Sequence, residues 1–258
     1  MPYIDTYLTI LRECNVNYDV INWDRLAIEE PNELTFRDNK TRIQRNFLDY
    51  LKYGRFVAKR LQKKEYQRVV VFGIEGAFFI SQILKHDYAD RYVLDIRDDH
   101  KIRRFFNIEP LIEKSCFIVL SSPGYKTWLP KSSKYVINHN STICSLDELR
   151  EVKLNYPLKG RLVIANIGNI RDYRINVDLI NSLQNNSQIA IKFHGQGVAN
   201  KELERYIKLR NITNVVLTGR YERDNEDSLY LEADMINVLR YNDSINNRTA
   251  LPNRLYNA

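Results

Sequence analysis

Cysteine is scarce in this chain. Only three cysteines occur among the 258 residues, Cys14, Cys116 and Cys144, and they lie far apart. An odd number of widely spaced cysteines, without the short intervals that zinc ligands need, excludes a disulfide framework and a zinc site. The cysteine pattern therefore favours a reducing compartment.

Long apolar runs and a signal sequence are also missing. No stretch approaches the roughly 20 apolar residues that a helix needs to cross a bilayer. Met1 is followed by Pro-Tyr-Ile-Asp, which is not a secretory leader. We expect a cytoplasmic protein, with at most a peripheral contact at the inner face of the membrane.

Several catalytic signatures are absent. The chain has no Gly-x-Ser-x-Gly sequence, which argues against a serine hydrolase, and no Asp-x-Asp sequence in a metal-binding loop. Gly73-Ile-Glu-Gly76 resembles part of a dinucleotide loop but lacks its full spacing, and Glu75 at a helix start would repel a phosphate. We therefore expect no resident cofactor and no metal ion.

The composition is that of a folded, basic protein. Hydrophobic residues make up 44% of the chain, enough for a real core, and the net charge is +7. Such a charge suits nucleic acid, anionic lipid or a phosphorylated substrate. The two basic clusters, Lys59–Lys64 and Lys101–Arg104, are more typical of solvated helix faces than of a binding site. Because nucleic-acid binding would rest on charge alone, we expect no nucleic-acid partner.

Apolar strands alternate with helical segments in both halves of the chain. This pattern predicts an α/β protein with two doubly wound Rossmann-like domains, each with a mostly parallel sheet. Pro157 and Gly160 mark a linker, so we expect one domain over 1–155 and a second over 156–258. The first domain lacks the expected opening strand and the second ends early, which indicates truncation at both ends; complete but irregular termini are the alternative.

The second half carries the more informative motifs. Gly168 closes a strand and opens a helix that Asp172 is suited to cap. Arg171 and Arg174 near that helix start oppose the helix dipole unless an anion lies beside them. They are candidates for phosphate contacts, and ion pairs with Asp172 or Asp178 are the structural alternative.

Two later loops follow strands in the same way. Gly195 and Gly197 let the backbone approach a ligand closely or make a tight turn. His194 before them is more typical of a structural histidine than of a catalyst. Tyr221 follows the next strand, where a flat ring can stack on a base.

The densest ionisable cluster of the first half is Asp95–His100, which follows a strand. Asp98, Asp99 or His100 could orient or deprotonate an acceptor hydroxyl. A structural salt-bridge cluster with the neighbouring arginines is an equal alternative. Ser122 follows another strand and indicates a turn into a helix.

These blocks, taken in order, resemble the GT-B glycosyltransferases of family 4. The family has a strand, a glycine and a basic loop, then a Gly-x-Gly turn, a Val-x-Leu-x-Gly strand, a Tyr-x-x-Ala-Asp block and a Pro-x-Lys-Leu-x-Glu helix. The matching segments here are 168–174, 195–197, 215–219, 230–234 and 252–258. Two departures stand out: Asn169 replaces the family's first basic position, and Asn257 replaces its donor-binding carboxylate.

The resemblance implies transfer of a sugar from a nucleotide-sugar donor to a glycan or lipid-linked acceptor, with retention and without a metal. The acceptor would be a bacterial capsular or cell-surface glycan. A non-catalytic, truncated fragment that binds nucleotide sugar without turnover is the alternative. The implied donor-binding residues are Gly168, Arg171, Arg174, Gly195, Gly197, Tyr221, Asn253 and Asn257; the acceptor-side residues are Gly73, Gly76 and Ser122; and Asp98 and His100 are the catalytic candidates.

Overall fold

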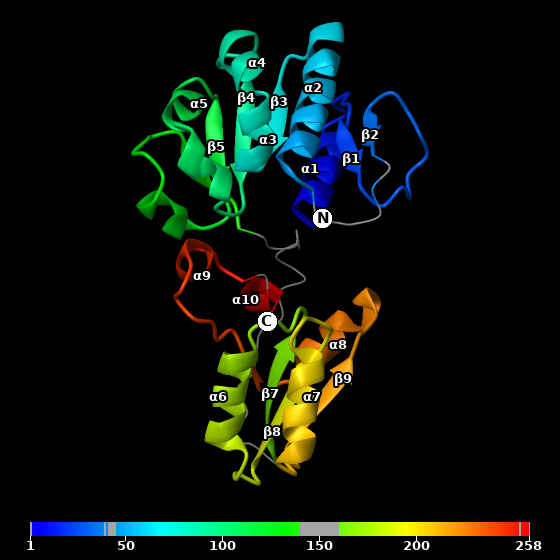
Figure 1. Cartoon of the computed structure of the whole chain (residues 1–258), viewed down its shortest axis with the longest axis vertical. Helices are drawn as coiled ribbons and strands as arrows, with labels where there is room; N and C mark the ends of the chain where they lie inside the picture. Colours follow the sequence, from blue (N-terminus) through cyan, green and yellow to red (C-terminus); the bar gives the residue numbers. More distant parts are fainter. Residues whose placement is uncertain (1, 39, 41–44, 140–159, 253, 258) are drawn as a thin grey trace. The chain divides into compact units, whose positions relative to one another are not determined.

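The computed structural model describes residues 2–38, 40, 45–139, 160–252 and 254–257. Its chain divides into two units (Figure 1). Unit 1 is Met1–His139 with Arg248–Ala250, and unit 2 is Asn140–Asn247 with Leu251–Ala258. The chain therefore passes between the units three times. The predicted boundary at 155/156 lies outside the described residues.

Unit 1 is built on four parallel strands in the order β3–β4–β5–β6. The strands are β3 (Val69–Phe72), β4 (Tyr92–Ile96), β5 (Phe117–Leu120) and β6 (Tyr135–Ile137). Every residue of β4 is buried, as expected of a central strand in a sheet with both faces covered.

The helices of unit 1 connect these strands and cover the sheet. The longest, α2 (Phe47–Lys63), begins at a capping box in which Asn46 and Asp49 each bind the other's backbone N–H. This cap explains why the helix starts at Phe47. The other elements are α3 (Ile74–Phe79), α4 (Ser81–His86), α5 (Glu109–Glu113) and the 3-10 turns η1 (Lys101–Phe105) and η2 (Pro123–Thr127).

The core of unit 1 lies between these helices and the sheet. Leu61 of α2, Leu84 of α4 and Leu111 of α5 meet Leu94 and Ile118 of the sheet in one buried cluster. α1 (Pro2–Glu13) packs against Phe72 through Tyr3 and Tyr7, with ring centroids 5.6 and 5.2 Å away.

A separate two-stranded sheet precedes α2. It pairs β1 (Asn22–Asp24) with β2 (Thr35–Arg37), also in parallel. Trp23 stacks on Tyr53 of α2 at 5.0 Å and contacts Phe36 edge-on at 5.5 Å. These aromatic contacts attach the small sheet to unit 1.

Unit 2 has four parallel strands in the order β10–β7–β8–β9. The strands are β7 (Leu162–Ile167), β8 (Ile189–His194), β9 (Val215–Gly219) and β10 (Met235–Ile236). Two helices, α6 (Tyr173–Leu183) and α7 (Asn200–Leu209), lie in front of this sheet in Figure 1 and enclose a core around Ile180, Phe193 and Leu203. The shorter elements are η4 (Arg223–Asn225), α8 (Glu226–Leu231), α9 (Ile245–Thr249) and α10 (Arg254–Asn257).

The parallel sheets and their intervening helices confirm the predicted α/β, Rossmann-like class. In unit 2, β7 lies between β8 and β10: the chain leaves β7 toward β8 and β9 on one side and later returns to add β10 on the other side. The β7–β10 pair, where the strand order reverses, is the topological switch point of the sheet. In doubly wound folds, ligands bind at this point, outside the carboxyl ends of the strands. The fold thus directs attention to the residues that follow β7 and β10.

Candidate functional site

Gly168 opens the loop at the carboxyl end of β7. Its φ of +106° suits glycine, and a Cβ atom there would meet nothing within 4 Å. The backbone at Gly168 is therefore open to an incoming group. The loop continues through the exposed Arg171 to α6.

Gly195 and Gly197 have a packing reason for being glycine. A Cβ on Gly195 would lie 2.0 Å from the carbonyl oxygen of Gly168, and one on Gly197 would lie 2.1 Å from that of Ile170. The two loops therefore touch through their backbones. This packing between two loops is neither of the two roles predicted for these glycines, and their close approach to a donor stays a prediction.

Arg254 lies at the switch point itself, at the start of α10. Its Nη1 donates to the Oδ1 of Asn166 in β7 and, at 3.0 Å, to the carbonyl oxygen of Asn237, which follows β10. Both asparagines are buried. One guanidinium thus bridges the carboxyl ends of the two diverging strands.

The electrostatic surroundings of Arg254 are cationic. Burial is the main effect that lowers the pKa of Arg254; Tyr230 opposes it, and the charges of Arg240 and Arg171 lower it further. Among the described residues, no carboxylate pairs with Arg254. A half-buried cation that faces other cations is a favourable place for an anion.

Arg171 and Arg174 are both exposed. Within the described part of the chain, neither forms the predicted alternative ion pair with Asp172 or Asp178; Asp178 instead accepts from the Tyr241 hydroxyl at 2.8 Å. Asp172 is the N-cap residue of α6 by position, but the prediction that its side chain caps the helix is wrong, since it makes no capping hydrogen bond. Arg171 remains close enough to Arg254 to affect its pKa.

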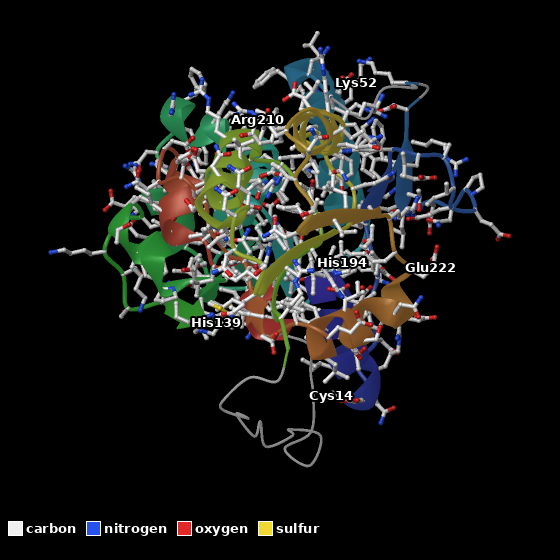
Figure 2. The ribbon with its side chains drawn as sticks, turned by 90° about the horizontal axis from the view of Figure 1, so that it is seen from below. Cys14, Lys52, His139, His194, Arg210 and Glu222 are labelled. Carbon is white, nitrogen blue, oxygen red and sulfur yellow. The ribbon has the colours of Figure 1, made fainter. Side chains whose placement is uncertain are left out.

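His194 and Tyr221 close the neighbouring strands. His194, labelled in Figure 2, is the buried last residue of β8, and its Nδ1 lies 2.9 Å from the Thr218 hydroxyl. This agrees with the structural interpretation, although its buried Nε2 has no partner among the described atoms. Tyr221 is half-buried, and burial and Glu226 raise its pKa.

Two further predicted donor contacts belong to the last segment of the chain. Asn253 lies outside the described residues, and Asn257 is the last residue of α10. Both were predicted from the sequence as donor contacts, whereas Arg254, which lies between them, was not. Arg254 occupies the basic position of the Pro-x-Lys-Leu-like segment, and that match could have identified it.

In unit 1 the corresponding edge is occupied by a buried ion pair. Arg97 binds both carboxylate oxygens of Asp95, with Nη2 2.7 Å from Oδ2, and the Tyr7 hydroxyl donates to the same carboxylate at 2.9 Å. The Arg97 guanidinium lies 4.9 Å from the centre of the Tyr3 ring. Asp95 and Arg97 therefore form structural contacts, as the salt-bridge alternative predicted.

The two catalytic candidates follow this pair. Asp98 is exposed, whereas His100 uses its Nδ1 to accept the backbone N–H of Ile102 at 3.2 Å and so caps η1. Asp99 pairs with Arg103 at 2.7 Å. Asp98 is thus the more accessible of the two candidates, and a catalytic role for either stays a prediction.

The acceptor-side candidates are distributed around the same edge. Gly73 follows β3 with φ +83° and donates its N–H to Asp95, and Gly76 lies in α3. Ser122 is buried; its Oγ accepts the Gly124 N–H at 3.1 Å and donates to the carbonyl oxygen of Thr249. Ser122 therefore has a structural role in holding residues 248–250 in unit 1.

Among the described residues, no three His, Cys, Asp or Glu side chains are grouped as a metal site would require. No helix in the same part of the chain is both long and apolar enough to span a bilayer.

Comparison with known proteins gives matches at the level of structure. No protein-family model and no curated protein sequence matches the chain. Anabaena Alr3699/HepE, solved with UDP and glucose, superposes with a TM-score of 0.52 at 11% identity, over 90% of this chain and 63% of that one. The lipopolysaccharide outer core galactosyltransferase WaaB superposes with a TM-score of 0.51 at 13% identity, over 74% of this chain and 53% of its own.

The chain has a GT-B fold. This confirms the predicted architecture. It spans about three fifths of the length of HepE and about half that of WaaB. At 11% and 13% identity the likeness concerns the fold, and the function has to be argued from the site.

Proposed function

We propose that the chain is part of a glycosyltransferase that moves a sugar from a nucleoside diphosphate sugar to a hydroxyl of a glycan or lipid-linked acceptor. The observation that carries the proposal is Arg254, a cation without a carboxylate partner in the described residues, at the switch point of the unit 2 sheet. HepE, the structural neighbour solved with UDP and glucose, supports a nucleotide-sugar donor.

Each candidate has a physical task in this proposal. Arg254, Arg171 and Arg174 neutralise the diphosphate as it departs, which is where charge develops during transfer. The open backbone of Gly168 lets the phosphates approach, and Tyr221 offers a ring to the base. Asn257 would hydrogen-bond the sugar or ribose, and its amide cannot act as a base.

The finer features are also part of the proposal. We infer retention of configuration, no metal, and an acceptor from bacterial capsular or surface glycan synthesis. Asp98 is the preferred acceptor contact because it is exposed, while His100 is engaged at η1. We place the protein in the cytoplasm. Any membrane contact would fall to the exposed Lys59, since Lys63 and Lys64 face Glu33 and Asp19.

The test is nucleotide binding by the full chain and by two variants. UDP, GDP and their glucose and mannose conjugates would be titrated calorimetrically against the wild type, Arg254→Gln and Arg210→Gln. Arg210 is the matched control, an exposed arginine at the end of α7. Loss of a charge-assisted hydrogen bond of about 1.5 to 3 kcal/mol predicts binding roughly 10 to 100 times weaker for Arg254→Gln only. Equal affinity in all three proteins would contradict the donor site.

A second function is suggested by Asn257, which stands where the family that the chain resembles has a donor-binding carboxylate. A nucleotide-sugar-binding module without turnover would show the same titration but release no nucleoside diphosphate. A coupled assay for UDP or GDP release, with and without a glycoside acceptor, separates the two functions.

A further inference from the structure

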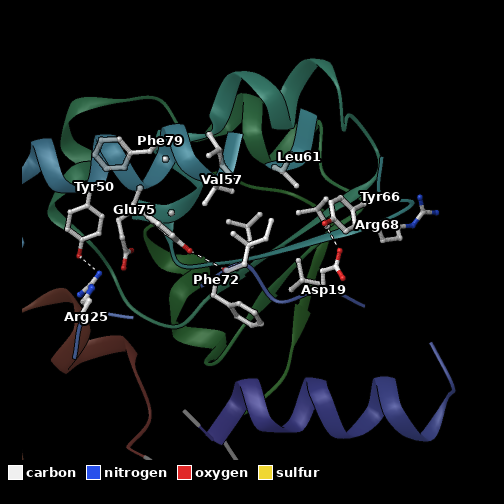
Figure 3. A pocket seen from close by; sticks show the side chains of 18 residues that line it. Asp19, Arg25, Tyr50, Val57, Leu61, Tyr66, Arg68, Phe72, Glu75 and Phe79 are labelled. Carbon is white, nitrogen blue, oxygen red and sulfur yellow. Dashed lines mark hydrogen bonds between the residues drawn. The ribbon is translucent and has the colours of Figure 1, made fainter. Parts of the chain in front are cut away.

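The helix α2 has two different sides. Tyr50, Val57 and Leu61 point from one side toward a cavity of about 270 Å³ in unit 1 (Figure 3). The opposite side is formed, at helical spacing, by four exposed residues: Leu48, Lys52, Arg55 and Lys59. We call the last three the basic stripe. The outward side of α2 thus begins with an apolar residue and continues with cations.

The basic stripe has no carboxylates to neutralise it. Among the described residues, none of its three cations forms an ion pair. The one acidic residue of α2, Asp49, is buried and is bound by Lys40 at 2.6 Å. Solvated helix faces commonly carry charges of both signs, often as pairs four residues apart. The stripe therefore concentrates positive charge in a way that a solvated face does not require.

An apolar ridge adjoins the start of the stripe. Phe47 and Leu48, the first residues of α2, are 58% and 62% exposed. The Phe47 ring lies 6.4 Å from that of Phe78 in α3, which lies 4.9 Å from that of Phe106 after η1. Phe105, the last residue of η1, is 81% exposed. Single exposed apolar residues are ordinary, but a connected group of them marks an interaction surface.

Two more cations accompany the other end of the ridge. Lys101 and Arg104 of η1 are exposed, and neither pairs with a residue that the structure describes. Residues three apart lie on the same side of a 3-10 helix, and Arg104 directly precedes Phe105. The ridge therefore has unpaired cations near both of its ends.

We propose that the ridge and the basic stripe together bind the interface of an anionic phospholipid bilayer. The phenylalanines enter the headgroup region, and the cations contact lipid phosphates. Phenylalanine and leucine flanked by lysine and arginine is the composition of segments that lie in this interface. A leaflet of anionic lipid offers negative charge to every flexible side chain, whereas a protein partner would need carboxylates matched to each one. The proposal extends the contact suggested for Lys59 to a defined surface, and it does not require sugar transfer.

The experiment measures co-sedimentation of the full chain with two kinds of vesicle. One is phosphatidylcholine alone, and the other contains roughly one third phosphatidylglycerol. We expect binding to the anionic vesicles only. It should weaken as the NaCl concentration rises from about 0.1 M to about 0.5 M, because salt screens exposed charges. Equal binding to both kinds of vesicle, or binding to neither, would overturn the proposal.

Charge variants locate the surface. At about fivefold for each cation, the partition coefficient should fall about 100-fold when three substitutions on α2 are combined: Lys52→Gln, Arg55→Gln and Lys59→Gln. The matched control removes the same charge from exposed positions in and directly after α7: Lys201→Gln, Arg205→Gln and Arg210→Gln. The control should change the coefficient less than about threefold. Equal losses in the two triple variants would contradict a local surface.

The ridge has its own readout. The emission of Phe105→Trp should shift to the blue on anionic vesicles and be quenched by brominated acyl chains, beyond the response of the wild type. Phe105→Ser should weaken binding several-fold with an unchanged dependence on salt, because it removes apolar area and no charge. An unshifted and unquenched emission would overturn the insertion of the ridge.

Nucleotide titration separates this proposal from the donor site. The α2 triple variant should bind UDP as the wild type does, since Arg254 belongs to unit 2 and α2 to unit 1. A wild type that binds anionic vesicles but no nucleotide would remove the donor site and keep this surface, and the reverse result would remove this surface alone. Retention on duplex DNA that the same three substitutions abolish, without vesicle binding, would assign the stripe to nucleic acid and overturn the proposal.

Discussion

Replacing Gly195 with alanine should damage unit 2 much more than the same replacement at Gly168. Both glycines follow neighbouring strands and have positive φ, +126° and +106°. Their surroundings differ: a Cβ on Gly195 would lie 2.0 Å from the Gly168 carbonyl oxygen, and a Cβ on Gly168 would meet nothing within 4 Å. Alanine at Gly168 therefore measures the cost of backbone strain alone, whereas alanine at Gly195 adds the cost of a steric collision.

The magnitudes follow from this difference. The backbone conformation costs an alanine about 1 to 2 kcal/mol at either position. At Gly195 the loops must also separate by about 1 Å, because a Cβ essentially never lies within 3.0 Å of another heavy atom. That movement strains the bonds from Gly168 N–H to His194 and from Gly195 N–H to Gly219, at 2.9 and 2.7 Å. Each contributes about 1 kcal/mol, so we expect a total of about 3 to 4 kcal/mol for Gly195→Ala.

Hydrogen exchange of peptides from β7 and β8 is the suitable assay, because a chain of two units need not unfold in one transition. Thermal melts should show a midpoint for Gly195→Ala lower by about 8 °C than for Gly168→Ala, at roughly 4 °C per kcal/mol in a domain of about 100 residues. Gly168→Ala should instead weaken donor binding with the fold retained. Equal losses of stability in the two variants would refute the reasoning.

Three further predictions concern stability. Asp95→Asn removes the carboxylate that binds the buried Arg97 in two places and should lower the free energy of unfolding by about 3 to 5 kcal/mol, measured by urea denaturation; a loss below 1 kcal/mol would contradict it. Burial lowers the pKa of His194, so the unfolded chain binds a proton more readily than the folded one. The free energy of unfolding should therefore decrease as pH drops from about 7.5 to 5.5, through the ordinary histidine pKa of about 6.5. In His194→Gln this decrease should be smaller. Ser122→Ala removes the contacts to Gly124 and Thr249 and should cost about 1 to 3 kcal/mol, with a change in the fluorescence of Trp128, whose indole N–H bonds the Thr249 hydroxyl at 3.1 Å; unchanged emission would argue against it.

The strands were the most predictable part of the fold. β3 is a continuous apolar run, and β4, β7 and β8 are mostly apolar, as a buried parallel strand requires. β2 was not predicted, because Thr35-Phe-Arg37 has one apolar residue and is held by aromatic contacts from Trp23 and α2. Local pattern cannot reveal a strand whose stability comes from distant rings.

The site was predictable only in outline. The loop glycines and Arg171 could be predicted as site residues because they directly follow a strand in the sequence. Arg254 could not, because it is placed at the site by its hydrogen bond to Asn166, 88 residues earlier in the chain. Its burial, and the absence of a carboxylate partner among the described residues, are tertiary properties that the sequence does not encode locally. The Asp95–His100 cluster shows the reverse problem, since a dense group of charges can be catalytic or can pair with itself. Only the geometry of Asp95 and Asp99 with their arginines decides for pairing.

The assignment of residues 248–250 to unit 1 bears on how this chain responds to cleavage. A single cut anywhere in 140–159 leaves the later fragment still carrying Thr249, whose backbone and hydroxyl are bound by Ser122 and Trp128 of the earlier fragment. We expect the two pieces to stay associated through these contacts, in the manner of a complementing fragment pair. A second cut next to the three-residue insert would remove this link.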